Sequence, residues 1–385
     1  MITGLGIVSP YGAGFSPYWD GLMSGRSAIT SFRASERLAI LGPGMGGVVG
    51  DRICAEPVGR RKTWMARTAF AEALCCAGME SVPDDALIVV ASQVPRSAGP
   101  QEFAREFESP DLTGSAGASV PVVHVPHACA SAAFATAYAF DLLRAGEADV
   151  AFVVGVVALN PYDLASMGLV RALSDRPARP FDTGRDGISL GEGGGVVVLE
   201  TEQAATRRGR RPRIELRAAS TLLGGENVAA SDTDLIERCA LTALERAGDC
   251  PIDYVQAHAT GTPQGDEAEA MAVDRVARRL GWPRGVPMSS HKGAIGHLLH
   301  ASTVPSIAAA IGFLITATVP GTAGLTNPIP LERIHLPAAS GPSGFARNAL
   351  VNSFGFYGNH ASLVISRHDQ QPTPQGVTSR WAFTE

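Results

Sequence analysis

Apolar runs separated by helical patterns extend over most of the chain. Continuous apolar segments rich in β-branched residues predict buried strands, and these lie at 86–92, 121–129, 149–159, 193–200 and 213–220. The alanine-rich stretch 131–148 follows the second of them and predicts a helix that closes near Arg144 and Gly146. Strands that alternate with helices indicate an α/β fold.

The second part of the chain repeats this alternation. An amphipathic helix is expected at 232–248, a strand that delivers a histidine at 253–261, and another helix at 266–281. Residues 349–366 predict two strands around a glycine-containing turn, and the basic run 206–213 is expected to be a solvated turn between the two parts. Two parts that each present a reactive side chain at a strand end suggest an ancient duplication.

Two further segments set the limits of the predicted domains. Residues 302–319 are apolar enough to resemble a membrane span, but they contain Pro305, serine and threonine, so a buried core helix is expected. The polar residues 368–385 are expected to form a loose tail. We therefore predict one half at 1–212 and a second at 213–367.

Composition and charge exclude several functional classes. The chain has 385 residues and a net charge of −5, which argues against nucleic-acid binding as its main role. Its cysteines lie outside any CxxC pair and predict neither a disulfide framework nor a metal site. No basic region precedes an apolar core at the N-terminus, so we expect a cytoplasmic protein without a signal peptide.

Three short motifs carry candidate chemistry. Cys129 lies in VPHACASAAF, where the alternative to a reactive thiol is a cysteine packed as a small apolar residue. His258 opens HATGTPQGDEAE, and Lys292 and His297 lie in SSHKGAIGHLLHA. Small neighbours allow a ligand or backbone to approach each of them closely. One cysteine and two histidines at the corners of strands suit nucleophilic catalysis on a thioester.

The order of these motifs resembles that of a known family. ITGLGIVSPYG, ACASA, RPFDTGRDGISLGEGGGVVVLE, HATGTPQGD, KGAIGH and NSFGFYGNHASLV together resemble a β-ketoacyl-[acyl carrier protein] synthase of the condensing-enzyme, thiolase-like superfamily. The resemblance covers nearly the whole chain. It implies a five-layered αβαβα fold built from two similar halves, usually as a dimer, and an acyltransferase of fatty-acid or polyketide biosynthesis.

The resemblance also implies roles for individual residues. Cys129 would take the acyl chain, and His258 and His297 would bind the malonyl thioester carbonyl and favour loss of CO₂. Lys292 would organise the site electrostatically, and Phe356 would gate the acyl pocket. The backbone N–H groups of Cys129 and Phe356 would form the oxyanion hole. The predicted helix after Cys129 is expected to favour its thiolate.

The substrate would arrive on the phosphopantetheine arm of an acyl carrier protein, so no cofactor bound to this chain is expected. Carrier proteins of this kind are acidic, and docking needs local positive charge. Arg60, Arg61 and Lys62 fall where the family places a docking helix, and Arg185 matches a basic position near the pocket mouth.

Several positions depart from the family pattern and leave alternatives open. Pro305 stands near the place of a usual glutamate, Tyr357 replaces a glycine of the gating turn, and His360 replaces an asparagine. These changes favour a specialised member, of a natural-product pathway. They leave open a non-decarboxylating acyltransferase on the same fold. A chain-length-factor-like partner subunit, in a heterodimer rather than a homodimer, is the other alternative.

Overall fold

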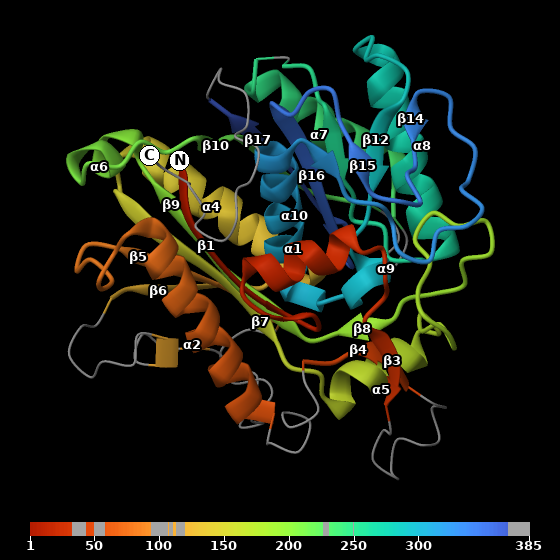
Figure 1. Cartoon of the computed structure of the whole chain (residues 1–385), viewed down its shortest axis with the longest axis horizontal. Helices are drawn as coiled ribbons and strands as arrows, with labels where there is room; N and C mark the ends of the chain where they lie inside the picture. Colours follow the sequence, from red (N-terminus) through yellow and green to blue (C-terminus); the bar gives the residue numbers. More distant parts are fainter. Residues whose placement is uncertain are drawn as a thin grey trace.

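The fold is described from a computed structural model, which covers residues 1–32, 44–49, 58–93, 107, 111–112, 120–225, 231–248 and 250–368 (Figure 1). The strands in these ranges are β1 (Ile2–Ser9), β2 (Gly12–Ala13), β3 (Ile29–Phe32), β4 (Gly44–Gly47), β5 (Leu87–Ala91), β6 (Val122–Val125), β7 (Val150–Val157), β8 (Leu190–Gly191), β9 (Gly193–Glu200), β10 (Ile214–Leu223), β11 (Tyr254–Gln256), β12 (Val286–Ser289), β13 (Thr318–Val319), β14 (Ile334–His335), β15 (Gly341–Pro342), β16 (Asn348–Gly355) and β17 (Asn359–Arg367). The α-helices are α1 (Phe15–Met23), α2 (Val58–Ala77), α4 (Ser131–Ala145), α5 (Pro161–Leu169), α6 (Glu202–Arg207), α7 (Thr233–Arg246), α8 (Pro263–Arg279), α9 (Lys292–Ile295) and α10 (Thr303–Thr316). Two short 3₁₀ turns, at Ala128–Ala130 and Leu299–Ala301, precede α4 and α10.

The main sheet contains two similar halves. One half runs β1-β9-β7-β5-β6 and the other runs β10-β17-β16-β11-β12, with β14 beyond it. In each half the first two pairings are antiparallel and the next two are parallel. The halves join at a single pair, Ile2 with Ile214 on β10. This repeated order gives two similar halves, as the predicted fold requires.

Helices cover both faces of each half and produce five layers (Figure 1). On β7, Val153 faces the central helices α4 and α10, whereas Phe152 and Val154 face the outer helix α2. On β17, Leu363 packs toward the same central helices and Val364 toward α7 and α8. Strands buried on both faces explain why the sequence shows continuous apolar runs rather than alternation.

The apolar segment near the C-terminal half is a core helix, as predicted. Leu299–Thr316 is the one helical stretch in the described residues long and apolar enough to cross a membrane, but 89% of it is buried inside the fold. Pro305 lies in the first turn of α10. Backbone N–H groups in a first turn have no acceptor within the helix, so the N–H that proline lacks costs no helical hydrogen bond. The carbonyl of Pro305 accepts a hydrogen bond of 2.7 Å from the hydroxyl of Tyr18.

Two expectations about connecting segments need correction. The second predicted strand, at 121–129, ends at Val125, because Pro126 lacks the N–H that a strand would use. The basic run 206–213 is not simply solvated. Arg208 lies 2.7 Å from the buried carboxylate of Glu200 and donates to the carbonyl of Ala77, so it ties β9 to the end of α2. The predicted tail lies outside the described residues after His368.

Candidate active site

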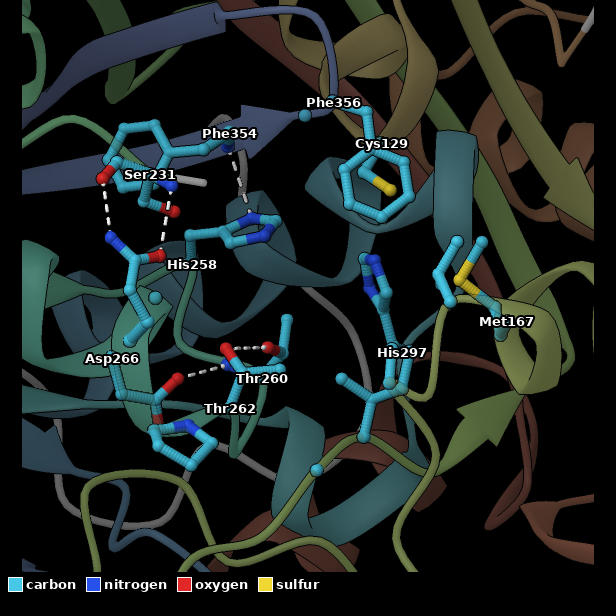
Figure 2. A pocket seen from close by; sticks show the side chains of 18 of the residues that line it. Cys129, Met167, Ser231, His258, Thr260, Thr262, Asp266, His297, Phe354 and Phe356 are labelled. Atoms are coloured by element: carbon cyan, nitrogen blue, oxygen red, sulfur yellow. Dashed lines mark hydrogen bonds between the residues drawn. The ribbon is translucent and has the colours of Figure 1, made fainter. Parts of the chain in front are cut away.

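One cavity brings together residues that are far apart in the sequence. It has a volume of about 440 Å³, and Cys129, His258, His297 and Phe356 all line it. Cys129 follows β6 in one half, whereas His258 follows β11 and His297 follows β12 in the other half. Figure 2 shows the Cys129 sulfur, the two imidazoles and the Phe356 ring around the same space. The site therefore lies where the strand ends of the two halves meet.

The nucleophile candidate sits on a sharp turn between β6 and α4. Ala128 has a φ of 48°, in the left-handed region, and the 3₁₀ turn Ala128–Ala130 leads directly into α4. The hydroxyl of Ser131 accepts a hydrogen bond of 2.8 Å from the backbone N–H of His127. This turn places the Cys129 side chain at the cavity wall, ahead of the helix.

Burial and the following helix act on the charge of Cys129 in opposite directions. Burial raises the pKa of the thiol from 9.0 to about 11, and the positive charge of Lys292 only partly opposes this. The predicted helix does begin directly after Cys129, at Ser131, and its N-terminus favours the thiolate. Burial thus works against the thiolate that the helix favours.

The proton on His258 is fixed by a backbone contact. Its Nδ1 accepts a hydrogen bond of 3.1 Å from the backbone N–H of Phe354. Nδ1 therefore carries no proton, and in the neutral ring the N–H group is at Nε2. Burial lowers the pKa of His258 well below 6.5, and the charge of Lys292 lowers it further. His258 is thus a neutral imidazole with one N–H to donate.

His297 is held in a similar state. Its Nδ1 lies 2.8 Å from the hydroxyl of Ser302, and its backbone N–H donates to the carbonyl of Ser189 at 2.7 Å. The two imidazole ring centres are 5.5 Å apart, with ring planes at 86°. Burial, followed by the charge of Lys292, lowers the pKa of His297 well below 6.5. Two neutral rings therefore face one cavity.

Lys292 lies behind these rings rather than on the cavity wall. The side chain is almost fully buried, and Nζ donates to the backbone carbonyl of His258. Burial lowers the pKa of Lys292 to about 8, and the carboxylate of Glu269 opposes this most strongly. Lys292 is thus placed to hold the His258 strand end and to influence the cavity electrostatically.

Sequence inspection missed the acidic partners of this strand end. Glu269 accepts hydrogen bonds from the backbone N–H groups of His258 at 2.9 Å and Ala259 at 2.7 Å. Asp266, one helical turn earlier on α8, accepts from Thr260 and Phe181. The signal was the spacing of three residues in DEAE, which puts both carboxylates on one face of a helix. These buried carboxylates fix the loop that presents His258.

The turn between β16 and β17 closes the cavity over the nucleophile. A Cβ added to Gly355 would lie 3.0 Å from the backbone nitrogen of Cys129 and 3.1 Å from that of Ala130. Glycine at this position therefore lets the Phe356 turn approach the Cys129 turn closely. Tyr357, where the family usually has glycine, still adopts a φ of 64° and exposes 72% of its surface. Holding a residue with a Cβ there costs roughly 1–2 kcal/mol.

The predicted docking helix does not present three free cations. Arg60 is exposed on α2, but Arg61 is only 8% exposed and pairs with the buried carboxylate of Glu192 at 2.9 Å. Lys62 is 4% exposed, and its ammonium lies 5.1 Å from the ring centre of Phe107. Burial of Arg61 and Lys62 corrects the expectation that they contact a carrier at the surface.

Arg185 lies beside the cavity, in agreement with its predicted position near the pocket mouth. Its side chain is 7% exposed. It donates to the carbonyls of Pro263 at 2.6 Å, Thr262 at 3.3 Å and Asp182 at 3.1 Å. Because Thr262 and Pro263 line the cavity, Arg185 supports the cavity rim. The predicted contact of Arg185 with a carrier stays a prediction.

Comparison with known proteins assigns the family. The model of the β-ketoacyl synthase N-terminal domain matches residues 111–205, and that of the C-terminal domain matches residues 215–326. A 3-oxoacyl-[acyl-carrier-protein] synthase 2 of Rhizobium meliloti is 31% identical, over 96% of this chain and 98% of that protein. The chain belongs to the β-ketoacyl synthase family.

Two further members of the family are similar to this β-ketoacyl synthase over nearly its whole length. The tetracenomycin polyketide synthase ketoacyl synthase alpha subunit of Streptomyces glaucescens is 31% identical, over 95% of this chain and 96% of that one. The solved structure of the ishigamide ketosynthase/chain length factor matches with a TM-score of 0.83 at 26% identity, over 96% of this chain and 99% of that chain. The predictions of a thiolase-like fold and of a condensing acyltransferase of fatty-acid or polyketide biosynthesis are confirmed.

Proposed function

We propose that this synthase transfers an acyl group from a carrier thioester to Cys129 and then extends it by decarboxylative condensation with a malonyl-carrier thioester. The observation that carries the proposal is a thiol and two neutral imidazoles on one cavity, with the N–H of His258 fixed at Nε2 by the backbone of Phe354. Acyl exchange needs only the thiol. Carbon–carbon bond formation also needs donors for an enolate.

In the first step the sulfur of Cys129 attacks the carrier thioester carbonyl. A new S–C bond forms, the carrier S–C bond breaks, and the proton of Cys129 passes to the departing carrier thiol. The tetrahedral oxyanion accepts hydrogen bonds from the backbone N–H groups of Cys129 and Phe356. The short approach between the Cys129 turn and Gly355 supports this pair of donors.

In the second step the malonyl thioester loses CO₂ inside the cavity. The electron pair of the broken C–C bond moves to the thioester oxygen, where His258 and His297 donate to the developing enolate. One preorganised donor of this kind is worth about 3–4 kcal/mol. The enolate carbon then attacks the acyl–Cys129 carbonyl, and the Cys129 sulfur leaves as a thiolate. This thiolate takes up one proton from water and returns to the thiol. Lys292 holds the His258 loop in place throughout.

The partners follow from this chemistry. Both acyl groups arrive on the phosphopantetheine arm of an acyl carrier protein, so the chain itself needs no bound cofactor or metal. The tetracenomycin relative is named as an alpha subunit, and the ishigamide structure as a ketosynthase/chain length factor. We infer a dimer, formed with a second copy or with a related synthase-like subunit, that works in the cytoplasm.

The test separates acyl loading from condensation. The synthase is incubated with acyl-carrier and malonyl-carrier labelled with ¹⁴C in the free carboxyl group, and released ¹⁴CO₂ and the mass of Cys129 are followed. Wild-type protein should load Cys129 and release ¹⁴CO₂. Cys129→Ala should abolish loading, and His297→Ala should keep loading while lowering condensation at least 100-fold.

Two results would contradict the proposal. Acyl transfer with the label retained in the malonyl carboxylate would indicate a non-decarboxylating acyltransferase. A wild-type chain that never loads Cys129, but enables a second subunit to do so, would indicate a partner subunit. A circular-dichroism melt of each variant controls for loss of the fold.

A further inference from the structure

A chain of side chains connects the nucleophile turn to the Phe356 turn. Asn359, the first residue of β17, donates from Nδ2 to the backbone carbonyl of Phe356 at 2.6 Å. The Oδ1 atom of the same side chain lies 2.8 Å from Nδ1 of His127, two residues before Cys129. Asn359 is 5% exposed, and both contacts are part-buried. The two turns are thereby linked independently of any substrate.

The direction of each hydrogen bond follows from the chemistry of the amide. Because the Asn359 amide nitrogen serves Phe356, the atom that faces His127 is an oxygen, which can only accept. Nδ1 of His127 must therefore carry the proton. The His127 ring also stacks on Phe134 of α4, with ring centres 4.0 Å apart and planes at 14°. His127 is thus anchored to the central helix on one side and to Asn359 on the other.

The carbonyl of Phe356, which accepts the hydrogen bond from Asn359, lies in the part of the Phe356 turn that would have to move to open the cavity. It belongs to the peptide between Phe356 and Tyr357, and Tyr357 occupies the left-handed region at 64°. Figure 2 shows the Phe356 ring beside the sulfur of Cys129. Rotation of this peptide to carry the ring away would break the 2.6 Å contact with Asn359.

We propose that His127 and Asn359 form a latch that holds the Phe356 turn closed over Cys129 and sets how readily a long acyl chain enters. The proposal rests on the function proposed above and adds two positioning residues to it. Neither residue is required to touch the reacting atoms. The latch acts through the backbone of Phe356, whose N–H is one of the proposed oxyanion donors.

The first experiment measures access to Cys129 without requiring turnover. Cys129 is alkylated with iodoacetamide or with N-dodecyl iodoacetamide, and peptide mass spectrometry follows each rate. Asn359→Asp keeps the acceptor for His127 but replaces the donor to Phe356 with a carboxylate oxygen. The ratio of long-probe to short-probe rates should rise at least threefold, while the surface control Asn327→Asp should leave it unchanged. An unchanged ratio in Asn359→Asp overturns the latch.

The second experiment measures condensation kinetics. His127→Phe keeps an aromatic ring to stack on Phe134 but lacks the N–H, so it and Asn359→Asp should each lower kcat about tenfold with the malonyl-carrier KM within about twofold. The double variant should be no slower than either single variant, because both break one linkage. His127→Gln, whose amide can donate to Asn359, should recover most of the rate.

Failure of the latch and failure of the proposed function give different results. Additive losses in the double variant, or a lowered melting temperature with unchanged kcat, contradict the latch alone. A wild-type protein whose probe ratio responds to Asn359→Asp, but which releases no ¹⁴CO₂, contradicts the proposed function alone.

Discussion

Burial in the cavity shifts the pKa values of the thiol and of the two imidazoles in opposite directions. Burial raises the pKa of Cys129 to about 11 and lowers those of His258 and His297 well below 6.5. In each case the neutral form is favoured, because a low-dielectric site penalises charge. A neutral imidazole can donate its one N–H to an enolate. A protonated imidazole would in addition be repelled by the positive charge of Lys292.

The protonation of the two rings gives the first prediction. The C2–H signals of His258 and His297 should not show a titration midpoint near pH 6.5, because burial lowers both pKa values well below 6.5. NMR of histidine-labelled protein, assigned with His258→Gln and His297→Gln, measures this. In urea, all nine histidines should titrate near 6.5. A native midpoint near 6.5 for either ring would contradict the assignment.

The lowered pKa values of His258 and His297 determine how these two residues make the free energy of unfolding depend on pH. In the folded state these rings stay unprotonated as the pH falls through 6.5, whereas the unfolded chain binds protons there. Their contribution to the free energy of unfolding therefore decreases as pH falls below 6.5. Glu269 acts in the opposite sense, because burial raises its pKa to about 7 and the folded state holds its proton more tightly.

Among the secondary-structure elements, the decisive feature is the close meeting of two turns. The hairpin of β16 and β17 brings Gly355 against the start of the turn that carries Cys129. Parallel strands β6, β11 and β12 end at the same region of the two half-sheets, so their reactive residues converge there. Small shifts of either turn would move the proposed oxyanion donors.

A glycine substitution tests this approach. Gly355→Ala adds a Cβ that would lie 3.0 Å from the nitrogen of Cys129, so the turns must separate by a few tenths of an ångström. We expect kcat for condensation to fall about tenfold, because a misplacement of about 1 Å can cost about 100-fold and this displacement is smaller. Gly344→Ala, where the new Cβ meets nothing within 4 Å, should retain wild-type kcat. Equal rates in the two variants would show that the approach is not needed.

At the scale of the whole molecule, the neighbouring basic residues of α2 have different surroundings: Arg61 is buried, whereas Arg60 is exposed. The carboxylate of Glu192 is fully buried and receives Arg61 at 2.9 Å as well as the backbone N–H of Leu159 at 3.1 Å. Arg61 thereby ties α2 to the end of β7. Arg60 and Arg67 are the exposed basic residues of this helix, and we propose Arg60 as a contact for an acidic carrier.

Paired substitutions distinguish these two roles. Arg61→Ala leaves Glu192 buried without its cation and should lower the free energy of unfolding in urea by about 3–5 kcal/mol. Arg60→Ala should leave that free energy almost unchanged but raise KM for the acyl carrier roughly 2–5-fold at low salt, with less effect at high salt. A carrier KM that does not respond to Arg60→Ala would remove Arg60 from the docking surface.

Much of this protein could be predicted from residue patterns, and the reason is physical. Doubly buried strands require continuous apolar runs, and Cys129, His258 and His297 each lie among small residues at a strand end. Such local constraints can be recognised in the amino-acid sequence alone. They predicted the α/β class, the core helix α10 and the three side chains that line the cavity, whereas the five layers were implied by the family resemblance.

Other properties depend on contacts between residues far apart in the chain, and only the tertiary structure decided them. The charge of Cys129 follows from the burial that the assembled cavity imposes, and the proton position of His258 follows from the N–H of Phe354, 96 residues away. Arg61 looks like a surface cation in the sequence but meets Glu192 across 131 residues. Desolvation and long-range pairing depend on three-dimensional packing, and a linear pattern does not contain that information.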